Sequence, residues 1–336
     1  MKNRKIKKIC ITNSYYVLLV FLLLSDDLEN ILFILGKDIK INLIKNCKII
    51  YLKSVINEKK YISFLINHII NYLYFKIKLR NISKQSIVFG QDHLCGVEYF
   101  KENFKFYIIE DGISYYLNEY YEEAKKKEEK KNYFYKEIKK FLKLYPHHGL
   151  DERLNTIYMS GMRKIPNILL NKKIRIFNLE KLWSQKKEED KEKILSFFNN
   201  NIEVEKIKNK KILLLTQPLS EDNLISEKEK IELYSKILKK YNIKEVIIKK
   251  HPREQTEYSK YFENIYILEE KIPIELLSLN SFKIEKVVTL FSTAIFNFNK
   301  EIKIDFYGTR VHPKLLEKWG DSDLIMKTNA FLYEEE

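Results

Sequence analysis

Short apolar runs alternate with longer amphipathic segments along the first part of the chain. Five of these runs are bounded by polar residues and are predicted to be strands, at 8–12, 32–35, 48–51, 86–89 and 106–109. Residues 15–25 follow a turn and cap at Asn13 and Ser14 and predict a helix, as does the amphipathic segment 58–78. Strands that alternate with helices in this way predict βαβ units and a mostly parallel sheet.

The same alternation returns in the second part of the chain. Predicted strands lie at 211–215, 245–248, 265–268, 286–290 and 303–306. Ser226 and Glu229 have the spacing of a capping box at the start of a helix that extends to Tyr241. A short helix is expected to begin in the segment 272–277.

This periodicity predicts an α/β fold made of two Rossmann-like, doubly wound domains. The first is expected to span residues 1–177 and the second residues 206–336, with a connecting helix at 178–205. The charged stretch 117–143 mixes lysine with glutamate and predicts a solvated helix with ion pairs four residues apart. Residues 308–336 are expected to form a tail.

The amino-terminal segment imitates a secretion signal, because a basic stretch precedes the apolar run 15–24. No cleavage site of small residues follows this run, which has about half of the roughly 20 residues that a membrane span needs. We therefore expect a cytoplasmic protein in which the run is a helix of the fold. Peripheral contact with the inner face of the cytoplasmic membrane stays open.

The composition suits a folded protein: the chain has 336 residues, of which 45% are hydrophobic and 32% charged. A net charge of +15 favours an anionic partner, although a composition shaped by A/T-rich codons explains the lysines equally well. Because the lysines are spread among glutamates, a nucleic-acid partner is not expected. The three cysteines lack metal-ligand spacing and indicate reduced thiols.

Ionisable side chains follow the predicted strand that ends at residue 248. They are Lys249, Lys250, His251, Pro252 and Arg253. Ligands of open α/β sheets bind at the carboxyl ends of the strands, and neighbouring lysines should lower the pKa of the histidine. The proline ends the strand and restricts the direction of the ring. A surface turn with a solvated histidine is the alternative.

Two other predicted strands end in polar residues. Glu110, Asp111 and Gly112 follow one of them, where adjacent carboxylates should repel each other so that one becomes a usable base. Ser292 and Thr293 follow the other, where two hydroxyls and free backbone N–H groups suit a phosphate. A common turn and an ordinary helix cap are the respective alternatives.

Other polar residues are interpreted as structural. Asp92 and His93 are expected at the start of a helix, and His147 and His148 in an exposed loop. No further ligand lies at metal-binding spacing from the paired histidines. The Asp-x-Asp string at 321–323 lies away from any predicted strand end, so no metal site is expected.

The order and spacing of these motifs resemble those of bacterial sialyltransferases. The stretches that carry the resemblance are 110–112, 250–252 and 291–293. The chain is similar in particular to glycosyltransferase family 52, the lipooligosaccharide sialyltransferases. Segments 9–24, 215–222 and 272–277 add support, and the resemblance covers about residues 6–310.

The resemblance implies an inverting, metal-independent transfer of sialic acid from CMP-sialic acid to a terminal galactose-type hydroxyl. The acceptor would be a cell-surface lipooligosaccharide or capsular glycan, and no cofactor would be needed. The implied architecture is of the GT-B type, two domains that face each other across a ligand cleft. A homodimer is compatible with the resemblance.

The resemblance also assigns roles to residues. Asp111 would deprotonate the acceptor, with Asp222 as a rival base, and His251 would protonate or hydrogen-bond the departing CMP phosphate. The implied donor-binding set is Ser292 and Thr293 at the phosphate, Lys249 and Glu275 at the cytosine and ribose, and Gln217 and Pro252 beside them.

Two other functions stay open. The same scaffold could use another nucleotide sugar or act in polysialic acid or capsule synthesis, and thermal stabilisation by CMP against UDP and GDP would discriminate. Alternatively, the lysine surplus could serve a non-catalytic protein that binds anionic glycans or membranes. Salt-sensitive liposome binding without CMP binding would favour that function.

Overall fold

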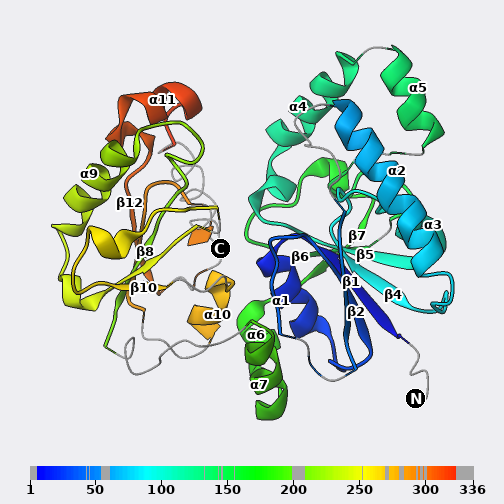
Figure 1. Ribbon diagram of the computed structural model, residues 1–336, viewed down its shortest axis with the longest axis horizontal. Helices are drawn as coiled ribbons and strands as arrows, with labels where there is room; N and C mark the ends of the chain where they lie inside the picture. The colour runs from blue at the N-terminus through cyan, green and yellow to red at the C-terminus, as the bar shows by residue number, and fades with distance from the viewer. Residues whose placement is uncertain are drawn as a thin grey trace. The chain divides into compact units, whose positions relative to one another are not determined.

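The computed structural model of the chain folds into two compact units, Met1–Asn199 and Asn200–Glu336 (Figure 1). It describes residues 6–322 except for 43, 45, 54–60, 132, 143, 145–146, 155, 199–208, 252, 269–271, 280–283, 293, 296–297 and 299–300. The boundary between the units falls inside the segment 178–205 that was predicted to connect two domains. The limits of 1–177 and 206–336 stay a prediction.

The first unit is built on a seven-stranded parallel sheet in the order β3-β2-β1-β4-β5-β6-β7. Its strands are β1 Lys8–Thr12, β2 Ile31–Leu35, β3 Lys48–Tyr51, β4 Ile87–Gly90, β5 Lys105–Ile109, β6 Thr156–Met159 and β7 Lys173–Ile176. The first five confirm the predicted strands to within a residue or two. β6 and β7 are additional strands that the sequence pattern did not predict.

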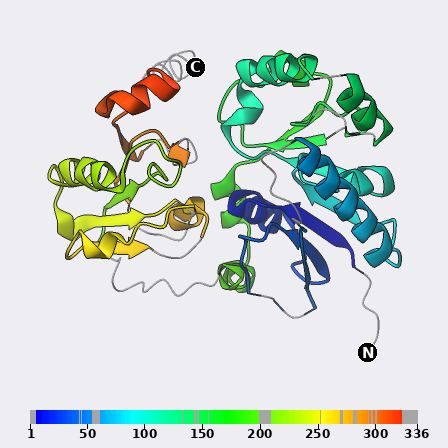
Figure 2. The same cartoon turned by 45° about the horizontal axis from the view of Figure 1, so that its top comes forward.

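Helices cover both faces of this sheet (Figures 1 and 2). They are α1 Tyr15–Leu24, α2 Tyr61–Lys78, α3 Glu98–Asn103, α4 Asn118–Glu129, α5 Tyr133–Phe141, α6 Leu179–Ser184 and α7 Glu188–Phe197, with 3-10 turns η1 Ile113–Tyr116 and η2 Asn167–Leu169. The predicted helices at 117–143 and 178–205 each correspond to two helices in the described residues. α1 confirms the predicted helix, and the Ser14 hydroxyl caps it by accepting from Val17 N.

α1 is a core helix of the first unit. Eight of its ten residues are buried, and the ring of Phe21 lies 6.1 Å from that of Phe33 and 5.6 Å from that of Phe89. Phe33 also contacts Phe197 of α7, with ring centroids 5.3 Å apart. α2 and α3 pack on the other face through Phe75 and its neighbours. The apolar run near the amino terminus is therefore explained by burial against the sheet.

The second unit contains a five-stranded parallel sheet in the order β10-β9-β8-β11-β12. Its elements are β8 Ile212–Leu215, α9 Glu227–Leu238, η3 Ile243–Glu245, β9 Val246–Lys249, η4 Tyr258–Lys260, β10 Tyr266–Leu268, α10 Ile274–Leu279, β11 Lys286–Thr289, β12 Lys303–Phe306, η6 Thr309–Val311 and α11 Pro313–Trp319. All five strands confirm the prediction, and so does the capping box of Ser226 and Glu229. α11 lies in the segment that was expected to be a tail. Within the part of the chain that is described, no helix is long and apolar enough to cross a membrane.

Candidate active site

At the carboxyl edge of the five-stranded sheet, the strands on the two sides of β8 are reached by chain connections that run in opposite directions. β8 lies between β9 and β11, so the chain leaves β8 toward one side of the sheet and later returns on the other. The strand register pairs Leu215 with both Lys249 and Thr289. The residues that follow these three strands therefore meet at one edge, which is where open α/β sheets bind ligands.

His251 lies at this edge, two residues after the end of β9. Its Nδ1 accepts a hydrogen bond from Arg253 N at 3.2 Å, so the neutral ring carries its proton on Nε2. Burial, and next the positive charge of Arg253, lower the pKa of His251 to about 4. The lowered pKa agrees with the prediction, although burial rather than the neighbouring lysines is the main cause. At neutral pH the ring is an uncharged donor through Nε2–H.

The carboxylate of Glu254 fixes the turn that holds His251. It accepts from His251 N at 2.7 Å, from the Thr216 hydroxyl at 2.5 Å and from the Tyr258 hydroxyl at 2.6 Å. Because the carboxylate is buried, the pKa of Glu254 is raised. Three donors and burial hold this side chain in one position, and with it the end of β8 and the turn after β9.

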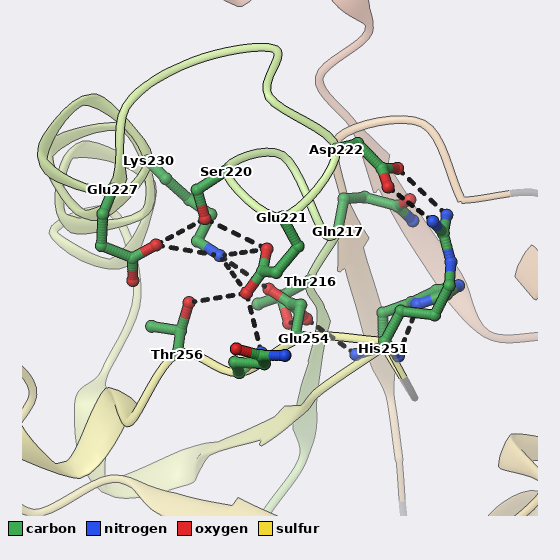
Figure 3. Close-up of polar contacts among 12 residues, drawn as sticks. Thr216, Gln217, Ser220, Glu221, Asp222, Glu227, Lys230, His251, Glu254 and Thr256 are labelled. Atoms are coloured by element: carbon green, nitrogen blue, oxygen red, sulfur yellow. Dashed lines mark hydrogen bonds and ion pairs between the residues drawn. The ribbon is translucent and has the colours of Figure 1, made fainter. Parts of the chain in front are cut away.

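A buried lysine of α9 connects Glu254 to the loop after β8 (Figure 3). Lys230 Nζ lies 2.9 Å from Glu221, 3.4 Å from Glu227 and 3.6 Å from Glu254. Its side chain is fully buried, and a buried ammonium needs such carboxylate partners. Glu254 and Lys230 were not singled out from the sequence. A signal existed, because Lys230 lies at helical spacing from buried apolar residues of α9.

Three of the predicted donor residues, Lys249, Gln217 and Ser292, end or follow strands β9, β8 and β11 at this edge. Lys249 is the last residue of β9, and its Nζ donates to Lys250 O at 3.3 Å. The backbone N of Gln217 donates to the Tyr234 hydroxyl at 2.8 Å. Ser292 Oγ accepts from Ala294 N at 3.4 Å, and Ser292 N donates to the Thr289 hydroxyl at 3.1 Å.

The remaining members of the predicted donor set are Glu275, Pro252 and Thr293. Glu275 lies in the first turn of α10 and is buried. Pro252 and Thr293 lie outside the described residues. The donor contacts of all these residues stay a prediction.

Asp222, the rival base, is engaged by Arg253. Its Oδ1 lies 2.5 Å from Nη1 and its Oδ2 lies 3.0 Å from Nη2, in a bidentate pair (Figure 3). A general base needs a lone pair directed at the proton that it removes. Both oxygens of Asp222 already accept from a guanidinium, which makes this carboxylate a less suitable base.

Asp111 lies at the corresponding edge of the first unit, after β5. Its Oδ2 accepts from the Gln91 side-chain amide. Gln91 is fully buried, and its Oε1 accepts from the Thr12 hydroxyl and from Asn13 N, each at 2.8 Å. Because these two donors fix the amide oxygen, the NH2 group must point toward Asp111. Gly112 follows with a φ of +83°, a conformation that favours glycine.

Glu110 and Asp111 bind different partners. Glu110 Oε1 accepts from Ser160 Oγ at 2.5 Å, from Ser160 N at 3.0 Å and from the Tyr16 hydroxyl at 3.2 Å. Burial raises the pKa of Glu110 to about 6. One carboxyl of the pair does titrate upward, as the sequence suggested, but the physical cause is burial. The carboxyl whose pKa is raised is that of Glu110.

The paired histidines are not in an exposed loop, so that prediction was wrong. His147 and His148 are both partly buried, and burial lowers the pKa of each to about 4. The carboxylate of Asp92, which is fully buried, accepts from His148 N at 3.0 Å and from Gly149 N at 2.9 Å. Asp92 lies two residues after β4, and its carboxylate thus holds the turn that contains both histidines near the end of this strand.

This turn brings His148 near Asp111, whose negative charge acts on the histidine's pKa. The sequence analysis missed that neighbour, because the contact joins residues far apart along the chain. Among the described residues, no group of three or more His, Cys, Asp or Glu side chains could hold a metal ion.

Comparison with known proteins gives one family and one curated relative. The sequence model of glycosyltransferase family 52 matches residues 31–315. A protein from Haemophilus influenzae, described as uncharacterised, is 37% identical over 251 residues, which is 74% of this chain and 76% of that protein.

Two solved structures share the fold. The α/β-galactoside α-2,3-sialyltransferase of Photobacterium phosphoreum matches 96% of this chain and 97% of its own, with a TM-score of 0.51 and 14% identity. The 2,6-sialyltransferase of a Vibrionaceae Photobacterium species, in a ternary complex with CMP and lactose, matches 93% of this chain and 75% of its own, with a TM-score of 0.54 and 12% identity. At these identities the likeness establishes the architecture of two parallel α/β sheets.

Proposed function

The chain belongs to glycosyltransferase family 52, and from that membership we propose that it is an inverting sialyltransferase. The proposed donor is CMP-sialic acid, and the acceptor is a terminal galactose-type hydroxyl of a cell-surface lipooligosaccharide or capsular glycan. The observation that carries the proposal is the neutral His251 with its proton on Nε2, at the carboxyl edge of the second sheet. The CMP and lactose bound by the Photobacterium 2,6-sialyltransferase support this choice of donor and acceptor.

On the donor side, the bond between the anomeric carbon and the phosphate oxygen breaks and its electrons go to the phosphate. His251 Nε2–H donates a hydrogen bond to that oxygen as the negative charge develops. An anionic phosphate beside the ring raises the pKa of His251 above its ligand-free value, which increases the fraction of the doubly protonated, cationic ring that can protonate the phosphate. The cationic side chains of Lys249 and Lys250 add positive charge at the same strand end.

On the acceptor side, Asp111 takes the proton of the sugar hydroxyl while the hydroxyl oxygen forms the new bond to the anomeric carbon. The hydrogen bond from Gln91 holds the carboxylate through Oδ2, which leaves Oδ1 for the incoming hydroxyl. Asp222 is the weaker choice, since Arg253 engages both of its oxygens.

The proposal is tested by incubating the protein with CMP-sialic acid and a panel of galactosides, with the products analysed by mass spectrometry and NMR. We expect one sialylated product and CMP in equal amounts. Thermal stabilisation by CMP, and not by UDP or GDP, is expected in parallel, because only a ligand of the folded state raises the melting temperature. Stabilisation by UDP or GDP alone would replace sialic acid transfer with another nucleotide-sugar reaction.

A further inference from the structure

His148 lies in a strained turn of the first unit. Its φ is +57°, a left-handed conformation that is uncommon for residues other than glycine. The turn keeps this conformation because the fully buried carboxylate of Asp92 accepts from His148 N at 3.0 Å and from Gly149 N at 2.9 Å. These contacts use only backbone N–H groups, and glycine or asparagine would adopt the same φ with less strain. The imidazole is therefore not needed for the turn, and strain of this kind is typical of functional sites.

Neighbouring rings hold the imidazole of His148 in place. Its plane is nearly parallel to that of His93, with ring centroids 5.4 Å apart and an angle of 7° between the planes. The ring of the buried Tyr115 packs against it at 5.0 Å. Both separations are those of ordinary aromatic pairs, so the imidazole has a defined orientation within the first unit.

The two ring nitrogens of His148 have different surroundings. Nδ1 lies 3.4 Å from the Tyr120 hydroxyl. In the part of the chain that is described, Nε2 has no hydrogen-bond partner and is not sealed from solvent. Burial of the ring lowers the pKa of His148 to about 4, so at neutral pH the imidazole is uncharged. Nε2 can then form one hydrogen bond with a polar ligand.

His148 and Asp111 lie at the same edge of the sheet. Asp92 holds the turn of His148 at the end of β4, and Asp111 follows β5, the neighbouring strand. The charge of Asp111 acts on the pKa of His148, which places the two side chains within electrostatic range. Beyond its chain neighbours, a Cβ added to Gly112 would meet no atom of the described residues within 4 Å. The space next to Asp111 is therefore open.

We propose that His148 selects the acceptor, with Nε2 hydrogen-bonded to a sugar hydroxyl next to the one that Asp111 deprotonates. This inference rests on the proposed transfer to a galactose-type sugar. The hydroxyls of a sugar ring have fixed relative positions, so a second contact beside the base decides which hydroxyl faces the carboxylate. A site that hydrogen-bonds one hydroxyl also discriminates against sugars that lack it. His148 thus determines specificity and takes no proton in the reaction.

The test combines His148→Asn with galactosides that each lack one hydroxyl. Asparagine tolerates the positive φ and keeps the backbone contacts with Asp92, but its amide is too short to reach the place of Nε2. In the wild type, kcat/KM for transfer from CMP-sialic acid should fall about tenfold with one of the deoxy acceptors, the effect of losing one hydrogen bond. His148→Asn should be about tenfold slower with the complete acceptor and should lose nothing more with that deoxy acceptor.

A second variant separates the ring from its nitrogens. His148→Phe keeps a planar ring against His93 but has no Nε2, so it should also be insensitive to that hydroxyl. The matched control is His312→Asn, the same substitution at another partly buried histidine. Asparagine is a good N-cap for α11 in place of His312, so this variant should keep the wild-type dependence on every hydroxyl. Melting temperatures of all variants, with and without CMP, report that they are folded.

The wild type gives a readout that needs no variant. The 15N chemical shifts of the His148 imidazole should change when CMP and the complete galactoside are added, and should not change with the deoxy acceptor that is transferred slowly. Release of CMP from CMP-sialic acid without any acceptor shows separately whether the donor is used. We expect the His148 variants to affect this hydrolysis less than they affect transfer.

Three results would overturn the inference and leave the proposed function intact. The first is a His148 variant that depends on every hydroxyl as the wild type does. The second is an equal loss of transfer and of acceptor-free hydrolysis, which would mean that His148 acts through Asp111 or the donor. The third is an imidazole whose 15N shifts respond to no acceptor. Absence of both transfer and CMP release in the wild type would instead overturn the proposed function, and this inference with it.

Discussion

The two ring nitrogens of His251 have different tasks because of the turn in which the residue lies. Nδ1 is occupied by the Arg253 amide at 3.2 Å, and only Nε2 is left to donate. That division depends on the turn geometry, and the turn is held by the hydrogen bond from His251 N to Glu254. The direction of the donor proton is thus set by a buried carboxylate three residues along the chain.

Glu254→Gln should therefore lower kcat of the proposed transfer by about 10- to 100-fold with a smaller change in KM. The carboxamide has one acceptor oxygen for the three donors that Glu254 satisfies, and hydrogen bonds to a charged acceptor contribute about 1.5–3 kcal/mol. Activity is measured with CMP-sialic acid, and 15N chemical shifts of the imidazole report whether the proton stays on Nε2. Glu257→Gln, which removes an exposed partner of Lys260, is the control. Unchanged kcat and an unchanged tautomer in Glu254→Gln would mean that Glu254 does not position His251.

Glu110 makes the stability of the first unit depend on pH. Burial raises its pKa to about 6 from the ordinary value of 4.5 for a glutamate, so the folded state holds this proton more tightly than the unfolded state. The stabilisation is complete below about pH 4.5 and is lost as the pH rises through about 6, a difference of about 2 kcal/mol.

Glu110→Gln cannot ionise and should remove that dependence. The free energy of unfolding of the variant, relative to the wild type, is expected to rise by about 2 kcal/mol between pH 4.5 and pH 7. Urea unfolding in a Trp319→Phe background measures it, because Trp183 then reports the first unit alone. Glu119→Gln, at an exposed position, should show no such change. Parallel pH profiles of wild type and Glu110→Gln would contradict the assignment.

α1 shows that the length and the borders of an apolar run can distinguish a buried helix from a membrane span. The run is too short for a membrane span, and Ser14 marks the start of a helix. The sheet face beneath it presents Phe33 and Phe89. The helix is apolar on all sides because neighbouring elements of the unit cover it as well.

Phe21→Ala should destabilise the first unit by about 3–5 kcal/mol, the usual range for deleting a buried aromatic ring. Phe21 is fully buried and contacts two rings of the sheet. Denaturant unfolding in the same Trp319→Phe background, followed through Trp183, measures the loss. Phe134→Ala, on the exposed side of α5, is matched in chemistry and should change stability by less than about 0.5 kcal/mol. Equal effects of the two variants would show that α1 is not a core element.

The sequence predicted ten of the strands because each is a short apolar run between polar residues. It missed β6 and β7, whose sequences TIYM and KIRI mix polar with apolar residues, in keeping with the mostly exposed β7 at the sheet edge. Asp111 and His251 could be proposed from the sequence because each lies two residues after a buried strand. Gln91, Glu254 and Lys230 were missed because their roles come from contacts between distant segments, which no local pattern encodes.

At the scale of the whole molecule, the proposed reaction divides its tasks between the two compact units. The proposed base Asp111 belongs to the first unit, and His251 with the other proposed donor residues belongs to the second. Donor binding and acceptor activation should therefore be separable by mutation, even though both are needed for transfer.

Asp111→Asn should lower kcat by about 10²- to 10⁴-fold, the usual contribution of a general base, while CMP still raises the melting temperature as in the wild type. His251→Ala should lower kcat by a similar factor and also weaken the stabilisation by CMP, because it removes a donor to the phosphate. Transfer assays and thermal unfolding with and without CMP measure both quantities on the full chain. Asp222→Asn is the decisive comparison, since Arg253 already engages that carboxylate. If Asp222→Asn loses transfer and Asp111→Asn keeps it, the base lies in the second unit and the division of tasks is wrong.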